Sequence, residues 1–157
     1  MCDASGHSHV DPDIYAVHDY ENDEDIFGKR MSAVDVSKPE SAWHTDTDIQ
    51  SPYVGQPYIV AEYGGTFWEA DYPQRAVVKK PDLQNWAYGK SPNVFLKHLD
   101  RLTSVLLDNP DIAGFCYTQL YDVEGETNGI YTYDRELKFK KRALKKIFTA
   151  PAAMEAD

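Results

Sequence analysis

A single carboxylate, Glu62, stands at the end of a short apolar run, and its position is the strongest chemical signal in the sequence. The run covers residues 58–61, and the pair Gly64-Gly65 follows soon after it. Such a run is typical of a strand buried on both faces of a parallel sheet. Burying a carboxylate costs several kcal/mol unless the group is paired or used. We therefore expect Glu62 either to pair with an arginine or to be a reactive group.

Polar side chains also follow the other two apolar runs. The cluster His18-Asp19-Tyr20 comes after a run that ends at Val17, and Gln119 comes after a run that ends at Thr118. The carboxyl ends of the strands in a (β/α)8 barrel share one face, and catalysis is built on that face. We therefore expect the three clusters to lie at one site.

Helices are expected between and after these strands, because apolar residues recur there at helical spacing. Their expected ranges are Asn22 or Asp23 to about Met31, Ser91 to Asn109, and about Lys138 to Phe148. Long loops are expected over residues 35–56 and 66–90. Strand, loop and helix repeated in this order predict βα units and a parallel sheet, which is an α/β fold.

The bulk composition excludes some classes of partner. The chain has 157 residues and a formal net charge of −10. A surface that binds nucleic acid or an anionic membrane would be basic, so neither partner is expected. No apolar run is long enough to span a bilayer. Cys2 and Cys116 are too few for a disulfide framework, so we expect a reducing compartment such as the cytoplasm.

Two groups of residues were weighed as metal ligands. One is His7, His9, Asp11 and Asp13 in the opening loop, and the other is the acidic loop with Asp122, Glu124 and Glu126. The first group lacks a rigid element, and the second lacks the alternating pattern and glycine turn of a calcium loop. We therefore expect neither a metal nor another cofactor.

Several motifs together resemble the family 2 glycoside hydrolases, which include β-galactosidases, β-glucuronidases and β-mannosidases. They are His18-Asp-Tyr20, Ile59-Val-Ala-Glu-Tyr-Gly-Gly65, Trp86-Ala-Tyr-Gly89, Gly114-Phe-Cys-Tyr-Thr-Gln-Leu-Tyr-Asp-Val-Glu124 and Asn128-Gly-Ile-Tyr-Thr-Tyr-Asp134.

The resemblance covers nearly the whole chain. It implies the C-terminal half of a catalytic TIM (β/α)8 barrel, from the end of strand five through strands six to eight and their helices. Residues 1–157 would then be one portion of that domain, in which residues 1–13 are a truncated loop leading into it and 149–157 are a tail.

The resemblance also implies roles for single residues. Glu62 matches the family's nucleophile, and His18 matches a histidine that lines the sugar subsite. The other expected substrate-binding residues are Asp19, Tyr20, Tyr63, Trp68, Trp86, Tyr117 and Gln119. The family's general acid/base is the Glu of an Asn-Glu pair, and this sequence contains no such pair.

A retaining glycosidase needs two carboxyl groups, one as nucleophile and one as acid and then base. The first hypothesis is therefore a β-galactosidase-like fragment that carries the nucleophile, lacks the acid/base and is inactive alone. The alternative is a non-catalytic carbohydrate-binding or structural half-barrel. The expected partners are a carbohydrate and either a second copy of the chain or the missing N-terminal half. The residues do not indicate which sugar is bound.

Overall fold

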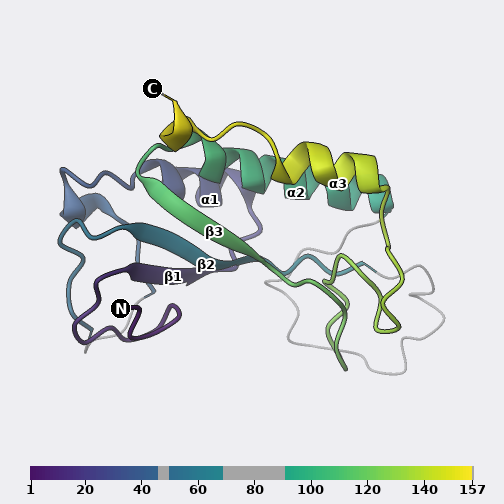
Figure 1. The fold of residues 1–157 in the computed structure, drawn as a ribbon, viewed down its shortest axis with the longest axis horizontal. Helices are drawn as coiled ribbons and strands as arrows, with labels where there is room; N and C mark the ends of the chain where they lie inside the picture. Colours follow the sequence, from purple (N-terminus) through teal and green to yellow (C-terminus); the bar gives the residue numbers. More distant parts are fainter. Residues whose placement is uncertain (46–49, 69–90, 157) are drawn as a thin grey trace.

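The computed structural model describes residues 1–45, 50–68 and 91–156, which form a mixed α/β fold (Figure 1). Three parallel strands pair in the order β1-β2-β3. Their bounds are Tyr15–Asp19 for β1, Tyr58–Gly64 for β2 and Ile112–Thr118 for β3. The parallel sheet that the sequence predicts is therefore confirmed, while its membership of a (β/α)8 barrel stays a prediction.

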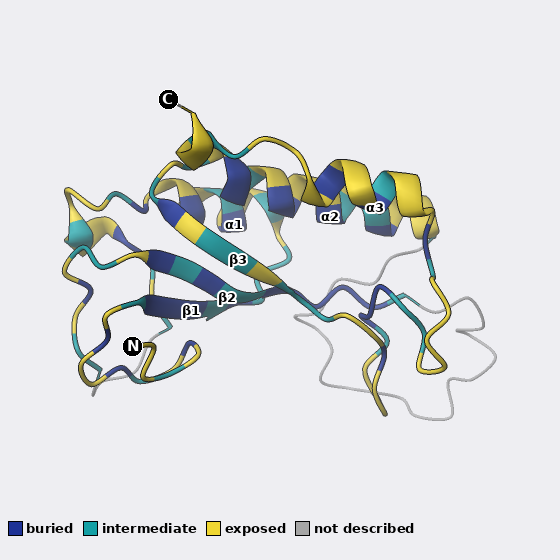
Figure 2. Cartoon of the chain, in the orientation of Figure 1, coloured by how far each residue is buried: buried dark blue, intermediate teal, exposed yellow. Residues whose placement is uncertain are grey.

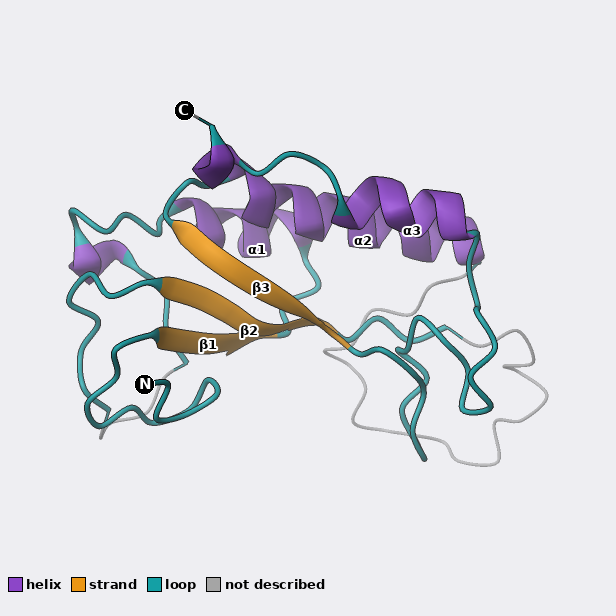
Figure 3. Cartoon of the chain, viewed as in Figure 1, coloured by secondary structure: helices purple, strands orange, loops and turns teal. Residues whose placement is uncertain are grey.

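Helices cover one face of this sheet (Figure 3). They are α1 (Glu24–Ser32), α2 (Pro92–Asp108) and α3 (Lys141–Phe148), with short 3-10 turns η1 (Pro39–Ser41) and η3 (Ala153–Glu155). The α2 helix contacts both α1 and α3. Because the helices lie on the same side, their apolar faces and one face of the sheet enclose a common core.

Capping residues mark the starts of α1 and α2. The Asp23 carboxylate accepts hydrogen bonds from the first turn of α1, and the Ser91 hydroxyl accepts one from the amide of Val94. Pro92 occupies the first turn of α2, where its missing N–H leaves no bond unmade. Both starts agree with the predicted ones.

The third helix begins three residues later than expected, at Lys141 rather than near Lys138. Lys138 lies in the preceding loop, where its ammonium group binds the carboxylate of Asp122. Phe139 stacks on Phe95 of α2, with 4.3 Å between ring centroids. These tertiary contacts hold Lys138 and Phe139 in the loop, so that α3 begins only at Lys141.

Buried residues gather between the sheet and the helices, where the core lies (Figure 2). Aromatic residues make up much of this core. Tyr58 and Tyr63 of β2 are fully buried, as are Phe27 of α1 and Phe95 of α2. A buried aromatic side chain contributes a large apolar area, and these four fix how the helices sit on β2.

The third strand is less buried than the sequence predicts. Ala113 and Cys116 of β3 are exposed, whereas β1 is almost entirely buried. Among the described residues β3 pairs on one side only, with β2. The β1 strand is covered by residues 1–13: the His9 ring hydrogen bonds to the Ala16 carbonyl at 2.8 Å.

Gly64 ends β2 in a conformation that requires glycine. Its φ is +94°, and a Cβ there would lie 2.4 Å from the ring of Tyr117. We expect Gly64→Ala to lower the free energy of unfolding by about 1–3 kcal/mol through backbone strain, with further loss from the contact. Urea denaturation measures this change.

Gly28→Ala is the matched control for this prediction. Gly28 lies within α1, and a Cβ there would meet Val105 at an ordinary 3.9 Å. Alanine in a helix is favoured over glycine by about 0.5–1 kcal/mol, so this variant should be as stable as the parent or more stable. Equal losses in the two variants would contradict the conformational argument.

Candidate functional site

Glu62 lies inside β2, two residues before the end of the strand, with its side chain 38% exposed. The Tyr20 hydroxyl donates a hydrogen bond to Oε2 of Glu62. The same oxygen lies 3.3 Å from Nδ1 of His18. His18 pairs in register with Glu62 across the sheet, and Tyr20 follows the end of β1. The first two predicted clusters therefore meet at one carboxylate.

Tyr20 is held as a hydrogen-bond donor to this carboxylate. Burial raises the pKa of the Tyr20 phenol well above its usual range, and the bond to Glu62 raises it further. Both effects disfavour the phenolate, because it would be poorly solvated and would face another negative charge. The hydroxyl thus keeps its proton and orients Glu62.

His18 is enclosed by the N-terminal segment. Its ring lies 5.1 Å from that of His7, and a Cβ on Gly6 would come within 2.1 Å of it. The buried Nε2 atom of His18 has no hydrogen-bond partner among the described residues. A ligand hydroxyl at that atom would therefore satisfy a polar group that is otherwise left unpaired.

Asp19 is 2% exposed and stabilises the turn that follows β1. Its Oδ1 accepts hydrogen bonds from Arg30 at 2.8 Å and from the Glu21 amide at 2.9 Å. Burial raises the pKa of the Asp19 carboxyl, while the Glu21 amide and Arg30 oppose that rise. These contacts fix the turn after β1 that carries Tyr20.

Tyr63 was expected to bind substrate, and the structure places its side chain in the core. Its side chain is fully buried in the core, and its hydroxyl hydrogen bonds to the Thr103 hydroxyl of α2 at 2.7 Å. Successive side chains of a strand point to opposite faces of the sheet. Tyr63 therefore points toward the helices, away from the face that Glu62 occupies.

Tyr117 also belongs to the core rather than to the group around Glu62. Its ring lies 5.7 Å from that of Tyr63, and its hydroxyl donates to the carbonyl of Asn128 at 2.7 Å. Tyr63 and Tyr117 pair in register between β2 and β3. Tyr117 thus links the end of β3 to the loop around Asn128.

Gln119 follows β3 directly and lies beside two residues of that loop. Its amide nitrogen is 2.7 Å from Oδ1 of Asn128 and 3.4 Å from Oε2 of Glu126. The Glu126 charge also contributes to raising the pKa of the Tyr20 phenol. Because Thr118, the residue before Gln119, pairs in register with Gly64 of β2, the third predicted cluster lies at the same edge of the sheet as the first two. Glu126 brings a second carboxylate to that edge.

Trp68, one of the two tryptophans expected to bind substrate, packs against the loop before α3. The Trp68 ring packs 5.5 Å from that of Phe139, and its backbone N–H donates to the Thr127 carbonyl at 3.0 Å. Trp68 is thus engaged with the loop before α3. Trp86 lies outside the described residues.

A buried ion pair that the sequence analysis missed organises this loop. The Lys138 ammonium binds both oxygens of Asp122, at 2.8 and 3.1 Å, and the Thr127 carbonyl at 2.8 Å. Asp122 also accepts from the Gly129 amide at 2.8 Å. The lysine side chain is only 2% exposed. The acidic loop is therefore held by an internal cation.

No group of metal-ligating side chains with a suitable arrangement occurs within residues 1–45, 50–68 and 91–156. In the opening loop, His9 is engaged by Asp3 at 2.7 Å and by the Ala16 carbonyl. Both partners are hydrogen-bond acceptors, so the histidine serves to dock residues 1–13 on β1. None of the helices in these ranges is long and apolar enough to cross a bilayer.

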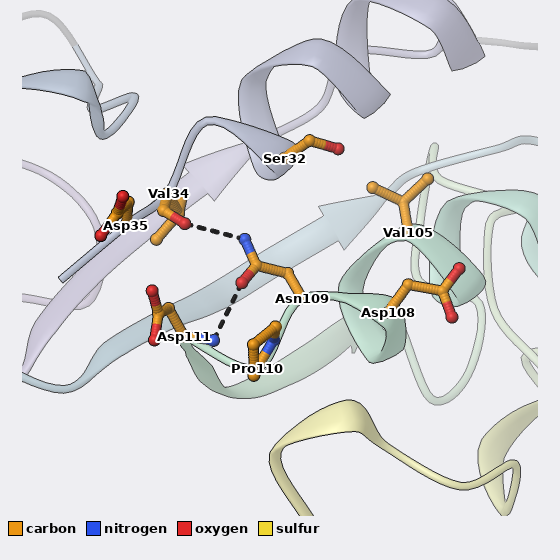
Figure 4. A pocket seen from close by; sticks show the side chains of 8 residues that line it. All are labelled: Ser32, Val34, Asp35, Val105, Asp108, Asn109, Pro110 and Asp111. Atoms are coloured by element: carbon orange, nitrogen blue, oxygen red, sulfur yellow. Dashed lines mark hydrogen bonds between the residues drawn. The ribbon is translucent and has the colours of Figure 1, made fainter. Parts of the chain in front are cut away.

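A cavity of about 400 Å³ lies at the other end of the strands, near the start of β3 (Figure 4). Asn109 lines it, and its side chain donates to the Val34 carbonyl at 3.0 Å and accepts from the Asp111 amide at 2.9 Å. Ligands in open α/β sheets bind beyond the carboxyl ends of strands. We therefore place the candidate site at Glu62 and not at this cavity.

Comparison with known proteins gives matches only among solved structures. No family model matches the chain, and no curated protein does. A β-glucuronidase of Bifidobacterium dentium complexed with coumarin-3-O-glucuronide matches with a TM-score of 0.42 and 19% identity, over 63% of this chain and 16% of that one.

The β-glucuronidase of Ruminococcus gnavus in complex with uronic isofagomine matches with a TM-score of 0.43 and 18% identity, over 77% of this chain and 17% of that one. The chain thus spans about a sixth of the length of either structure.

Proposed function

We propose that this chain carries the nucleophile half of a retaining β-glycosidase site, and that Glu62 is the nucleophile. The observation that carries the proposal is the convergence of Tyr20 and His18 on the Glu62 carboxylate, at the carboxyl end of a central parallel strand. The family 2 resemblance of the motifs around these residues supports the same assignment. A partly exposed carboxylate that accepts a hydrogen bond from Tyr20 and lies beside the His18 ring is both accessible and oriented.

In the proposed reaction an oxygen of Glu62 attacks the anomeric carbon of a β-glycoside. The bond from that carbon to the leaving oxygen breaks, and its electron pair departs with the leaving group. The product is a glycosyl ester on Glu62, which water then hydrolyses. Tyr20 holds the attacking carboxylate in place through its hydroxyl, and the buried Nε2 of His18 has no hydrogen-bond partner among the described residues.

The general acid/base is proposed to come from outside the described residues. Such an acid protonates an ordinary leaving group and is worth about 10²- to 10⁴-fold in rate. A complementary barrel segment would supply it, and β3 offers an edge for pairing, since its outer side is unpaired among the described strands. On this proposal the chain alone hydrolyses ordinary glycosides very slowly.

A glycosyl donor that needs no acid tests the proposal on the chain by itself. Fluoride leaves without a proton, and a 2-fluoro substituent slows hydrolysis of the ester because it disfavours the oxocarbenium-like transition state. The probes are the 2-deoxy-2-fluoro-β-glycosyl fluorides with the gluco, galacto and manno configurations. We expect one of them to add a single fluorosugar to the chain. Peptide mapping by mass spectrometry should locate the ester on Glu62.

An ester on another carboxylate would overturn the assignment of Glu62. Absence of labelling by all three donors, with sugar binding retained, would favour the non-catalytic carbohydrate-binding half-barrel instead. Glu40→Gln is the control, because Glu40 is an exposed carboxylate of η1 and should not affect labelling.

A further inference from the structure

A second carboxylate, Glu126, is built into the same edge of the sheet as Glu62. A tight turn places it there: the backbones of Val123 and Glu126 exchange two hydrogen bonds of 3.1 Å. Gly125 has a φ of +84°, which suits the third position of such a turn. The backbone of Glu126 is therefore fixed, while its side chain stays exposed.

The Glu126 side chain contacts Gln119, which follows the strand next to the one that carries Glu62. Its Oε2 lies 3.4 Å from the Gln119 amide, directly after the end of β3, where Thr118 pairs in register with Gly64. Its negative charge acts on the Tyr20 hydroxyl together with that of Glu62. The negative charges of Glu62 and Glu126 thus both raise the pKa of the Tyr20 hydroxyl.

Two cations on the segments around these residues, Arg30 and Lys138, are already engaged, and the Arg135 guanidinium lies over the Tyr121 ring, 3.5 Å from its centroid. Arg30 binds Asp19 at 2.8 Å, and Lys138 binds Asp122 at 2.8 Å. The chain as a whole has a formal net charge of −10. A third negative charge entering beside Glu62 and Glu126 would therefore be repelled at short range and gain little from the rest of the surface.

The polar groups around Glu126 suit hydroxyl groups. A carboxylate accepts hydrogen bonds, and a sugar hydroxyl can donate one. Asn128 is fully buried, and its Nδ2 donor has no hydrogen-bond partner among the described residues. An acceptor from the ligand would satisfy it.

We infer that the site takes a neutral glycone and that Glu126 determines this specificity. Its carboxylate accepts a hydrogen bond from a hydroxyl of a neutral hexopyranoside and excludes the carboxylate of a uronic acid. The inference rests on the proposed function, because it describes the substrate class of that same site.

An isosteric pair of ligands isolates the effect of charge. An aryl β-glucuronide and the corresponding aryl β-glucuronamide differ in charge but hardly in shape, and aryl β-hexosides complete the set. We expect calorimetry or NMR titration of the full chain to show binding of the hexoside and of the amide. The glucuronide should bind at least about tenfold more weakly than its amide, and this difference should shrink as salt is raised.

Glu126→Gln should remove most of the discrimination between acid and amide, because it keeps the size of the side chain and deletes its charge. Glu136→Gln makes the same change in net charge at an exposed residue of the following loop, and it should leave the ratio unaltered. Glu126→Lys should reverse the preference. Both positions are exposed on the native chain, so the three variants are expected to fold.

The inference is overturned if the glucuronide binds as tightly as its amide, or if Glu126→Gln and Glu136→Gln have equal effects on the ratio. With Glu62 labelled by a fluoroglycosyl fluoride, either result removes the inference and leaves the proposed function intact. If neither labelling nor binding of any glycoside occurs, both fail together.

Discussion

Replacing Glu62 with glutamine should slow glycosylation of the chain by an activated glycosyl fluoride by about 10⁴-fold, the scale on which the loss of one catalytic group acts. Glutamine keeps the shape of the side chain and its contact with Tyr20, but its amide oxygen is a far weaker nucleophile than a carboxylate. Following the labelled mass over time gives the rate directly.

Glu40→Gln is again the matched control, since it removes one exposed carboxylate elsewhere. A Glu62→Gln rate within about tenfold of the parent, equivalent to only ~1.4 kcal/mol in the barrier, would show that another group forms the bond. Because fluoride leaves unaided, the result does not depend on where the general acid comes from.

Lys138→Met should lower the free energy of unfolding by about 3–5 kcal/mol, because it leaves the Asp122 carboxylate buried without its cation. A loss of this size is a large fraction of the stability of an ordinary domain. The Thr127 carbonyl would lose the same ammonium donor. Chemical denaturation followed by tryptophan fluorescence measures the change.

A matched exposed pair separates this effect from a general loss of positive charge. Lys38 binds Asp35 at 2.9 Å with its side chain 67% exposed, and Lys38→Met should cost less than about 1 kcal/mol. Adding Asp122→Asn to Lys138→Met should recover part of the loss, because the buried charge disappears while an oxygen stays for the Gly129 amide. Equal losses from Lys138→Met and Lys38→Met would contradict the argument.

Local patterns were enough to predict the strands, their parallel pairing and the starts of two helices. The apolar run that ends at Thr118 matches β3 to its last residue, and Ser91-Pro92 marks the start of α2. Such signals depend on residues close together in the chain, so a single sequence contains them. The start of α3 failed because it depends on Lys138 meeting Asp122, sixteen residues away.

The candidate site was predictable only in part. The carboxyl-end rule for parallel strands correctly brings Tyr20 to Glu62. The period of two along a strand could have removed Tyr63, since adjacent residues of β2 cannot both face the same side. Glu126 and Asn128 carried no local signal, because their positions depend on the turn at Gly125 and on contacts with Gln119.

The place of Glu62 on β2 has a consequence for the entropy of ligand binding. Of the described strands, β2 is the one paired on both sides, so its backbone is the most constrained of the three. A side chain on such a strand is already oriented before a ligand binds, because its backbone loses conformational entropy during folding. We therefore expect ligand binding to immobilise little of this strand and to leave its conformational entropy nearly unchanged.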